Sequence, residues 1–179
     1  MKKIVLWSLL IALFIAPAAY AQSARDAIKA LKRAEARVDM GINYNEYILA
    51  VADARVEVEM YLESQEAKQK VALAGMIKKI LEHYETARTV WKIKVSKTED
   101  IGTVFGHLIC LRDDPEGNLG RRLLKKYPQA EKPVDHGGAL ATRANQKEGC
   151  DEVLVDNLIH IIWVEASKDL RQATKMLFN

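Results

Sequence analysis

The chain has 179 residues, of which 49% are hydrophobic and 28% are charged, and its formal net charge is +3. These values exclude a disordered chain, which would be poorer in apolar residues, and a general nucleic-acid binder, which would be strongly basic. The length suits one domain that can bury a sizeable hydrophobic core.

Residues 1–21 have the pattern of a secretory signal peptide. Lys2 and Lys3 precede an uncharged apolar run, residues 4–15, and small residues stand at positions 19 and 21, where a signal peptidase reads the chain. A membrane-spanning helix needs about 20 apolar residues, and this run is shorter. We therefore expect cleavage after Ala21, with no permanent membrane anchor in the mature protein.

The short positive start and the Ala-x-Ala site are typical of bacterial export, so we expect a periplasmic or secreted protein. Residues 22–179 would then form a single helical domain. Loss of Lys2 and Lys3 with the leader lowers the formal net charge from +3 to +1. Such a nearly neutral chain is not expected to bind nucleic acid.

Four segments have apolar residues at the three- and four-residue intervals of amphipathic helices. They cover about residues 23–40, 45–64, 66–95 and 151–177. Ser23 can cap the first of them and Gly41 can end it. Because such apolar stripes have to be buried against one another, the sequence predicts an all-α, antiparallel bundle of about four main helices.

A long irregular excursion, residues 93–149, precedes the last helix. It holds seven of the nine glycines and all three prolines that follow the leader. Connections inside compact helical bundles are usually about 2–8 residues long, so this one is unusual. Binding features often lie on long connections held by a rigid scaffold, and we expect the same here.

The only two cysteines are Cys110, inside the excursion, and Cys150, at the start of the last helix. No C-x-x-C or C-x-x-C-H motif accompanies them, and an exported protein lies in an oxidising compartment. We therefore predict a Cys110–Cys150 disulfide that clamps the excursion onto the bundle. Closing a loop of about 40 residues would stabilise the fold by about 4 kcal/mol on the chain-entropy model.

The residues before Cys110 favour a short helix. Ser96 and Glu99 have the spacing of a capping box, and apolar residues follow at helical intervals as far as Leu108. Two glycines, Gly102 and Gly106, weaken that interpretation. An alternating strand is therefore the second interpretation for this segment.

A basic segment, residues 117–128, lies inside the excursion. If it is helical, its cations share one side, namely Arg121, Arg122, Lys125 and Lys126. Leu123, Leu124 and Tyr127 could pack beneath them. The cationic side could be a solvated edge, or it could bind an acidic partner protein, anionic lipid or a phosphorylated ligand.

Arg55 interrupts the apolar stripe of the second helix, while Glu165 and Asp169 flank the stripe of the last. Charged groups in such positions are rarely buried without a partner. We predict a structural ion pair between Arg55 and one of these carboxylates, which would fix the helix register.

No motif for chemistry is complete. The chain lacks Glu-x-x-His, His-Glu-x-x-His and G-x-S-x-G, so no catalytic, metal-binding or cofactor-binding residue is predicted. His83 is interpreted as part of a polar edge, and Asp156 and His160 as an exposed pair. Non-covalent haem needs only one or two axial ligands, and the candidates for these are His83, His107, Met60 and Met176.

The sequence thus favours a non-enzymatic binding module of the bacterial cell envelope, without a cofactor. Its partner would be another envelope protein or an anionic ligand. The alternative is a ligand-binding bundle that holds haem, a metal or a small apolar molecule.

Overall fold

The computed structural model describes residues 23–97, 108–110, 119–131 and 152–178. The predicted leader, Cys150 and much of the excursion lie outside the described residues. None of the described helices is both long enough and apolar enough to cross a membrane.

The described chain is helical apart from one short ladder of two strands, so the predicted all-α class is confirmed. In chain order the elements are α2 (Ala24–Asp39), α3 (Tyr44–Leu62), α4 (Gln65–Gln69), α5 (Val71–Lys97), β1 (Leu108–Cys110), α6 (Leu119–Lys126), the 3-10 turn η1 (Pro128–Glu131), β2 (Glu152–Leu154) and α7 (Val155–Phe178).

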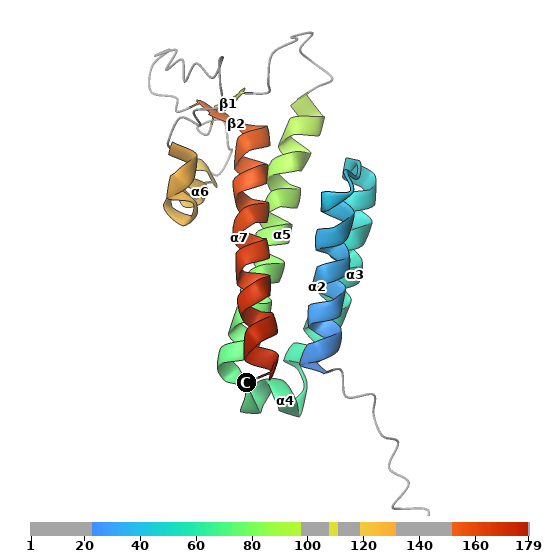
Figure 1. Ribbon diagram of the computed structural model, residues 1–179. Coiled ribbons are helices and arrows are strands. Elements are labelled where there is room, and N and C mark those ends of the chain that lie inside the picture. Colours follow the sequence, from blue (N-terminus) through green and yellow to red (C-terminus); the bar gives the residue numbers. More distant parts are fainter. Residues whose placement is uncertain (1–22, 98–107, 111–118, 132–151, 179) are drawn as a thin grey trace, which may run out of the picture.

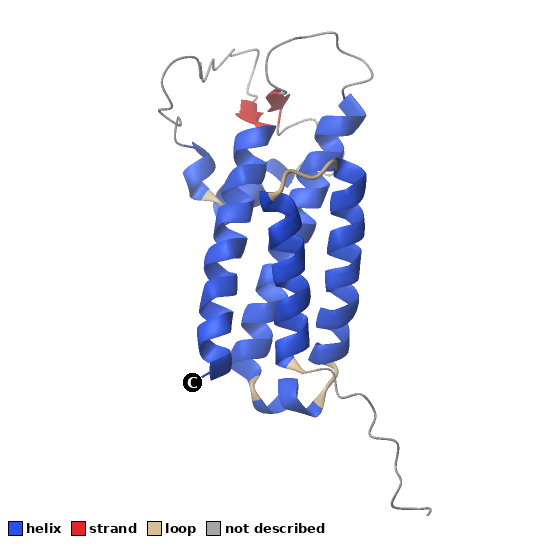
Figure 2. Cartoon of the chain, turned by 45° about the vertical axis from the view of Figure 1, so that its right-hand side comes forward, coloured by secondary structure: helices blue, strands red, loops and turns tan. Residues whose placement is uncertain are grey.

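The four long helices run alternately up and down and lie side by side (Figure 1). The most extensive packing joins α5 to α7 and α2 to α3, and α3 also packs on α5. Contact between α2 and α7 is less extensive, so the bundle consists of two tight pairs of helices with a looser seam. The short helix α4 crosses the end of the bundle opposite the strands (Figure 2).

Local sequence signals set the helix ends. The Ser23 side chain accepts a hydrogen bond from the Asp26 amide, which makes Ser23 the predicted cap of α2. Gly41 follows the end of α2 with a φ of +77°, a conformation that glycine adopts without steric cost. Asn43 and Glu46 form a reciprocal capping box at the start of α3, with bonds of 3.1 and 3.0 Å.

The core contains four fully buried tyrosines as well as aliphatic side chains. These are Tyr47, Tyr61, Tyr84 and Tyr127. The Tyr47 hydroxyl donates to the Tyr84 carbonyl at 2.9 Å and accepts from the Trp163 indole at 3.2 Å, which links α3, α5 and α7. Trp91 packs on both of these rings, with centroid distances of 5.3 Å to Tyr47 and 5.6 Å to Trp163.

Two predictions about the excursion need correction. Residues 93–97 continue α5, and the Ser96 hydroxyl bonds back to the carbonyls of Lys92 and Ile93. Ser96 is thus inside a helix and caps none, because a serine hydroxyl can satisfy a carbonyl of the preceding turn instead. Glu99, its expected partner, lies outside the described residues.

Residues 108–110 form a strand, which was the second interpretation of this segment. The helix that was expected first is therefore wrong for these three residues. β1 pairs with β2 in antiparallel register, with Cys110 opposite Glu152 and Leu108 opposite Leu154. β2 occupies positions that were expected to begin the last helix. That helix, α7, instead begins at Val155.

Candidate functional site

Residues 119–131, here called the α6–η1 segment, lie beside α7 on the side of the bundle away from α2 and α3 (Figure 1). Leu123 and Tyr127 are buried, four residues apart, on the side that faces the bundle. Burial of both confirms that part of the predicted packing. The basic segment is helical over Leu119–Lys126, which was the condition for its cations to share one side.

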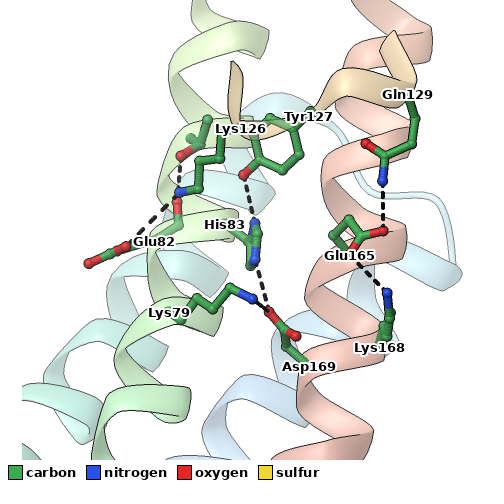
Figure 3. Close-up of polar contacts among 10 residues, drawn as sticks. Lys79, Glu82, His83, Lys126, Tyr127, Gln129, Glu165, Lys168 and Asp169 are labelled. Carbon is green, nitrogen blue, oxygen red and sulfur yellow. Dashed lines mark hydrogen bonds and ion pairs between the residues drawn. The ribbon is translucent and has the colours of Figure 1, made fainter. Parts of the chain in front are cut away.

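Tyr127 anchors the segment through a buried polar chain. Its hydroxyl lies 2.6 Å from Nδ1 of His83 on α5, and Nε2 of His83 lies 3.1 Å from Oδ2 of Asp169 on α7 (Figure 3). Lys79 places its Nζ 2.9 Å from the same carboxylate oxygen. His83 and Asp169 are only 3% and 4% exposed, so α6–η1, α5 and α7 are joined inside the protein.

Neutral His83 satisfies every bond in this chain. The Tyr127 hydroxyl donates to Nδ1, and Nε2–H donates to Asp169. Burial lowers the pKa of His83, and the bond to Asp169 opposes that effect only in part. Burial also raises the pKa of Tyr127 to about 12, so the tyrosine remains a phenol and a donor.

Asp169 is the ionised member of the chain. Burial alone would raise its pKa, but hydrogen bonds from Lys79 and His83 outweigh burial and lower it. A carboxylate between an ammonium and an imidazole N–H is a strong, directional acceptor. The three side chains therefore hold the α6–η1 segment at a defined position on the bundle.

The sequence interpretation missed His83, which is buried rather than part of a polar edge. Its position in the sequence indicated burial, because the buried residues Ile80 and Ala87 lie three and four residues away on the same helix face. Asp169 likewise falls between the buried Ala166 and Ala173. Polar residues at such stripe positions face the interior, so they need buried partners.

Two further contacts fasten the segment. Gln129 donates to Glu165 on α7 at 3.1 Å, and Lys126 lies 4.0 Å from Glu82 on α5. The Lys126 ammonium also stands 5.7 Å from the centroid of the Tyr127 ring. Because these contacts are exposed to solvent, they help to orient the α6–η1 segment but contribute little to the free energy of folding.

The outward side of α6 carries the predicted cations. Arg122, Lys125 and Lys126 are exposed, whereas no side-chain detail is described for Arg121. Arg122 and Lys125 have no ion-pair partner among the residues that the structure describes. The segment therefore has a buried anchoring side and an opposite side with unneutralised positive charge.

Arg55 does not form the predicted pair with Glu165 or Asp169. Its Nε lies 2.6 Å from Glu59, and Nη1 lies 3.3 Å from Oε1 of Glu85, an ion pair without hydrogen-bond geometry. The prediction is wrong because α3 packs on α2 and α5, whereas both carboxylates belong to α7. Glu165 instead contacts Gln129 and lies 3.6 Å from Lys168.

The other candidate side chains are dispersed. Both ring nitrogens of His83 are occupied within the protein, and Met60 is 45% exposed on α3. His107 lies outside the described residues. Asp156 bonds to Lys94 rather than to His160, so that predicted pair is also wrong. No group of three or more His, Cys, Asp or Glu side chains that could bind a metal occurs in the described part of the chain.

Comparison with models of protein families, with curated proteins and with solved structures gave no match to this chain. Its function therefore has to be inferred from its own residues.

Proposed function

We propose that this chain is an exported, non-enzymatic binding protein of the bacterial cell envelope. In this proposal the α6–η1 segment is its recognition element, and its ligand is the acidic surface of another envelope protein. Export is supported by the leader pattern of residues 1–21.

The observation that carries this proposal is the two-sided character of the α6–η1 segment. Its inner side is held by the buried Tyr127–His83–Asp169 chain, so the segment cannot slide or rotate freely on the bundle. Its outer side presents Arg122 and Lys125 to solvent without ion-pair partners in the described part of the chain. A rigidly mounted basic face attracts and orients an acidic partner.

The Cys110–Cys150 disulfide belongs to the same proposal. Glu152 lies opposite Cys110 in the strand register. Cys150 lies outside the described residues, so support for the crosslink comes from the leader pattern and the even number of cysteines. The crosslink would fix the excursion at the start of the last helix.

Partner recovery tests the basic face. The four cations of α6 are replaced together, as Arg121→Gln, Arg122→Gln, Lys125→Gln and Lys126→Gln. Tagged wild-type and variant proteins are crosslinked in the producing cells and recovered from the envelope fraction. Because the attraction is electrostatic, we expect the specific partner to be lost from the variant, and recovery from wild type to fall with added salt.

A matched control carries the same loss of charge on the other pair of helices. It replaces four exposed cations of α2, namely Arg25, Lys29, Lys32 and Arg33. This control should recover the partner like the wild type. Identical recovery by all three proteins would overturn the role given to the α6–η1 segment.

A further inference from the structure

The seam between the two helix pairs contains an open groove with a volume of about 440 Å³. One wall comes from the end of α2, with Glu35, Val38 and Asp39, and the other comes from α7, with Trp163 and Arg171 among its residues. This volume is in the range of small-molecule sites in proteins. The groove lies on different helices from the α6–η1 segment and does not depend on the function proposed for it.

The α2 wall is negatively charged and not neutralised. Glu35 and Asp39 are one helical turn apart, and neither has an ion-pair partner among the described residues. The nearby cation of that turn, Arg37, is directed to Asp53 of α3 at 3.8 Å. The negative end of the α2 dipole adds to the same field.

The field of these carboxylates also reaches the bundle interior. The Tyr84 hydroxyl is buried and has no hydrogen-bond partner among the described residues. Burial is the main cause of its raised pKa, and the charges of Glu35 and Asp39 raise it further. Glu35 is partly exposed and Asp39 is exposed, so both carboxylates are accessible to a ligand in the groove.

The α7 wall of the groove is mixed, because Trp163 and Val164 are apolar whereas His160, Ser167 and Arg171 are polar. Trp163 contributes its ring while its indole N–H is already bonded to Tyr47, so the ring presents π surface rather than a free donor. Val38 and Val164 lie beside it. An indole next to carboxylates is the combination that binds an ammonium group attached to an apolar body.

We propose that the α2–α7 groove binds a small organic ammonium ion with an apolar body. The ammonium contacts Glu35 and Asp39, and the apolar body lies on Trp163. Arg171 on the opposite wall carries positive charge of its own, so the ammonium is expected at the α2 wall, where the two carboxylates lie.

Two probes of nearly equal shape and opposite charge test this site. 2-Phenylethylammonium and 3-phenylpropionate are titrated separately into the ¹⁵N-labelled protein, and the Trp163 indole and the amides of residues 35–39 are followed by NMR. The ammonium should give saturable shifts at these positions, and the carboxylate should not. Absence of saturable binding at millimolar ammonium, or equal binding of the two probes, would overturn the proposal.

The variant Glu35→Gln/Asp39→Asn should weaken ammonium binding by about tenfold or more, because both attractive charges are removed. Its matched control, Glu59→Gln/Glu63→Gln, removes the same charge from exposed positions at the end of α3, away from Arg37, and should change the affinity by less than about twofold. Equal affinities of these two variants would refute the assignment. Circular dichroism melts verify that both variants fold, which is expected because all four side chains lie at or near the surface.

Discussion

A histidine with both ring nitrogens bonded inside a bundle makes stability depend on pH. His83 is neutral when it bridges Tyr127 and Asp169, because Nδ1 has to accept a proton and Nε2 has to donate one. Lys79 and Lys126 add positive charge nearby, and both oppose protonation of the imidazole. Folding therefore selects the uncharged ring.

The direction of the pH effect follows from this selection. An unfolded histidine takes up a proton near pH 6.5, whereas burial lowers the pKa of folded His83. Its contribution to stability is complete above pH 6.5 and is lost as the pH falls below that value toward the lower folded pKa. Asp169, whose folded pKa is also lowered, loses its own contribution only in more acid solution, below its unfolded pKa of 3.8.

We therefore expect the urea midpoint to fall between about pH 7 and about pH 5, and expect His83→Gln to flatten that part of the profile. His160→Gln is the control, because His160 is exposed on α7. Urea unfolding followed by circular dichroism at each pH measures the effect. An unchanged slope in His83→Gln would show that other groups cause the pH dependence.

At the scale of elements, the Tyr127 hydroxyl supplies the buried hydrogen bond that docks the α6–η1 segment on α5. Tyr127→Phe keeps the buried ring but leaves Nδ1 of His83 without its donor, at a cost of about 1–3 kcal/mol. Amide hydrogen exchange should accelerate in α6 more than in the middle of α5. Tyr44→Phe, at a partly exposed ring that packs on Trp91, should leave exchange in α6 unchanged.

The capping box of α3 allows a second test at this scale. Asn43→Ala removes the acceptor for the Glu46 amide and should destabilise the protein by about 1 kcal/mol. Asn45→Ala, two residues later on an exposed position, should cost less than about 0.5 kcal/mol. Equal losses in thermal melts of the two variants would mean that the cap does not define the start of α3.

Periodicity and caps predicted the long helices from sequence because both signals are local, although the helix expected over 66–95 is interrupted at Lys70, between α4 and α5. Ser23 and Gly41 bound α2 as expected, since each acts on its own turn of the chain. Ser96 was misinterpreted because a serine that caps a helix and one that bonds back into a helix look alike in sequence. The partners of Arg55 and the burial of His83 depend on which helices become neighbours, and spacing along one helix does not contain that information.

At the scale of the whole molecule, the proposed disulfide should join the two ends of the excursion. Thiol titration of denatured protein should find no free thiol without reductant and two after reduction. Reduction should lower the free energy of unfolding by about 4 kcal/mol, because the unfolded chain regains the entropy of a loop of about 40 residues. The free energy of unfolding of the Cys110→Ser/Cys150→Ser variant should not change on addition of reductant. Two free thiols in the native protein would contradict the crosslink.

The junction between β2 and α7 has a mechanical consequence. β2 ends at Leu154 and α7 begins at Val155, so no residue of slack separates the ladder from the helix. A pulling force applied at β1 would pass through the ladder to the first turn of α7. Because α7 packs most extensively on α5, that load would be shared by both helices. A partner bound near this end would therefore be connected to the helical bundle without a flexible linker at this junction.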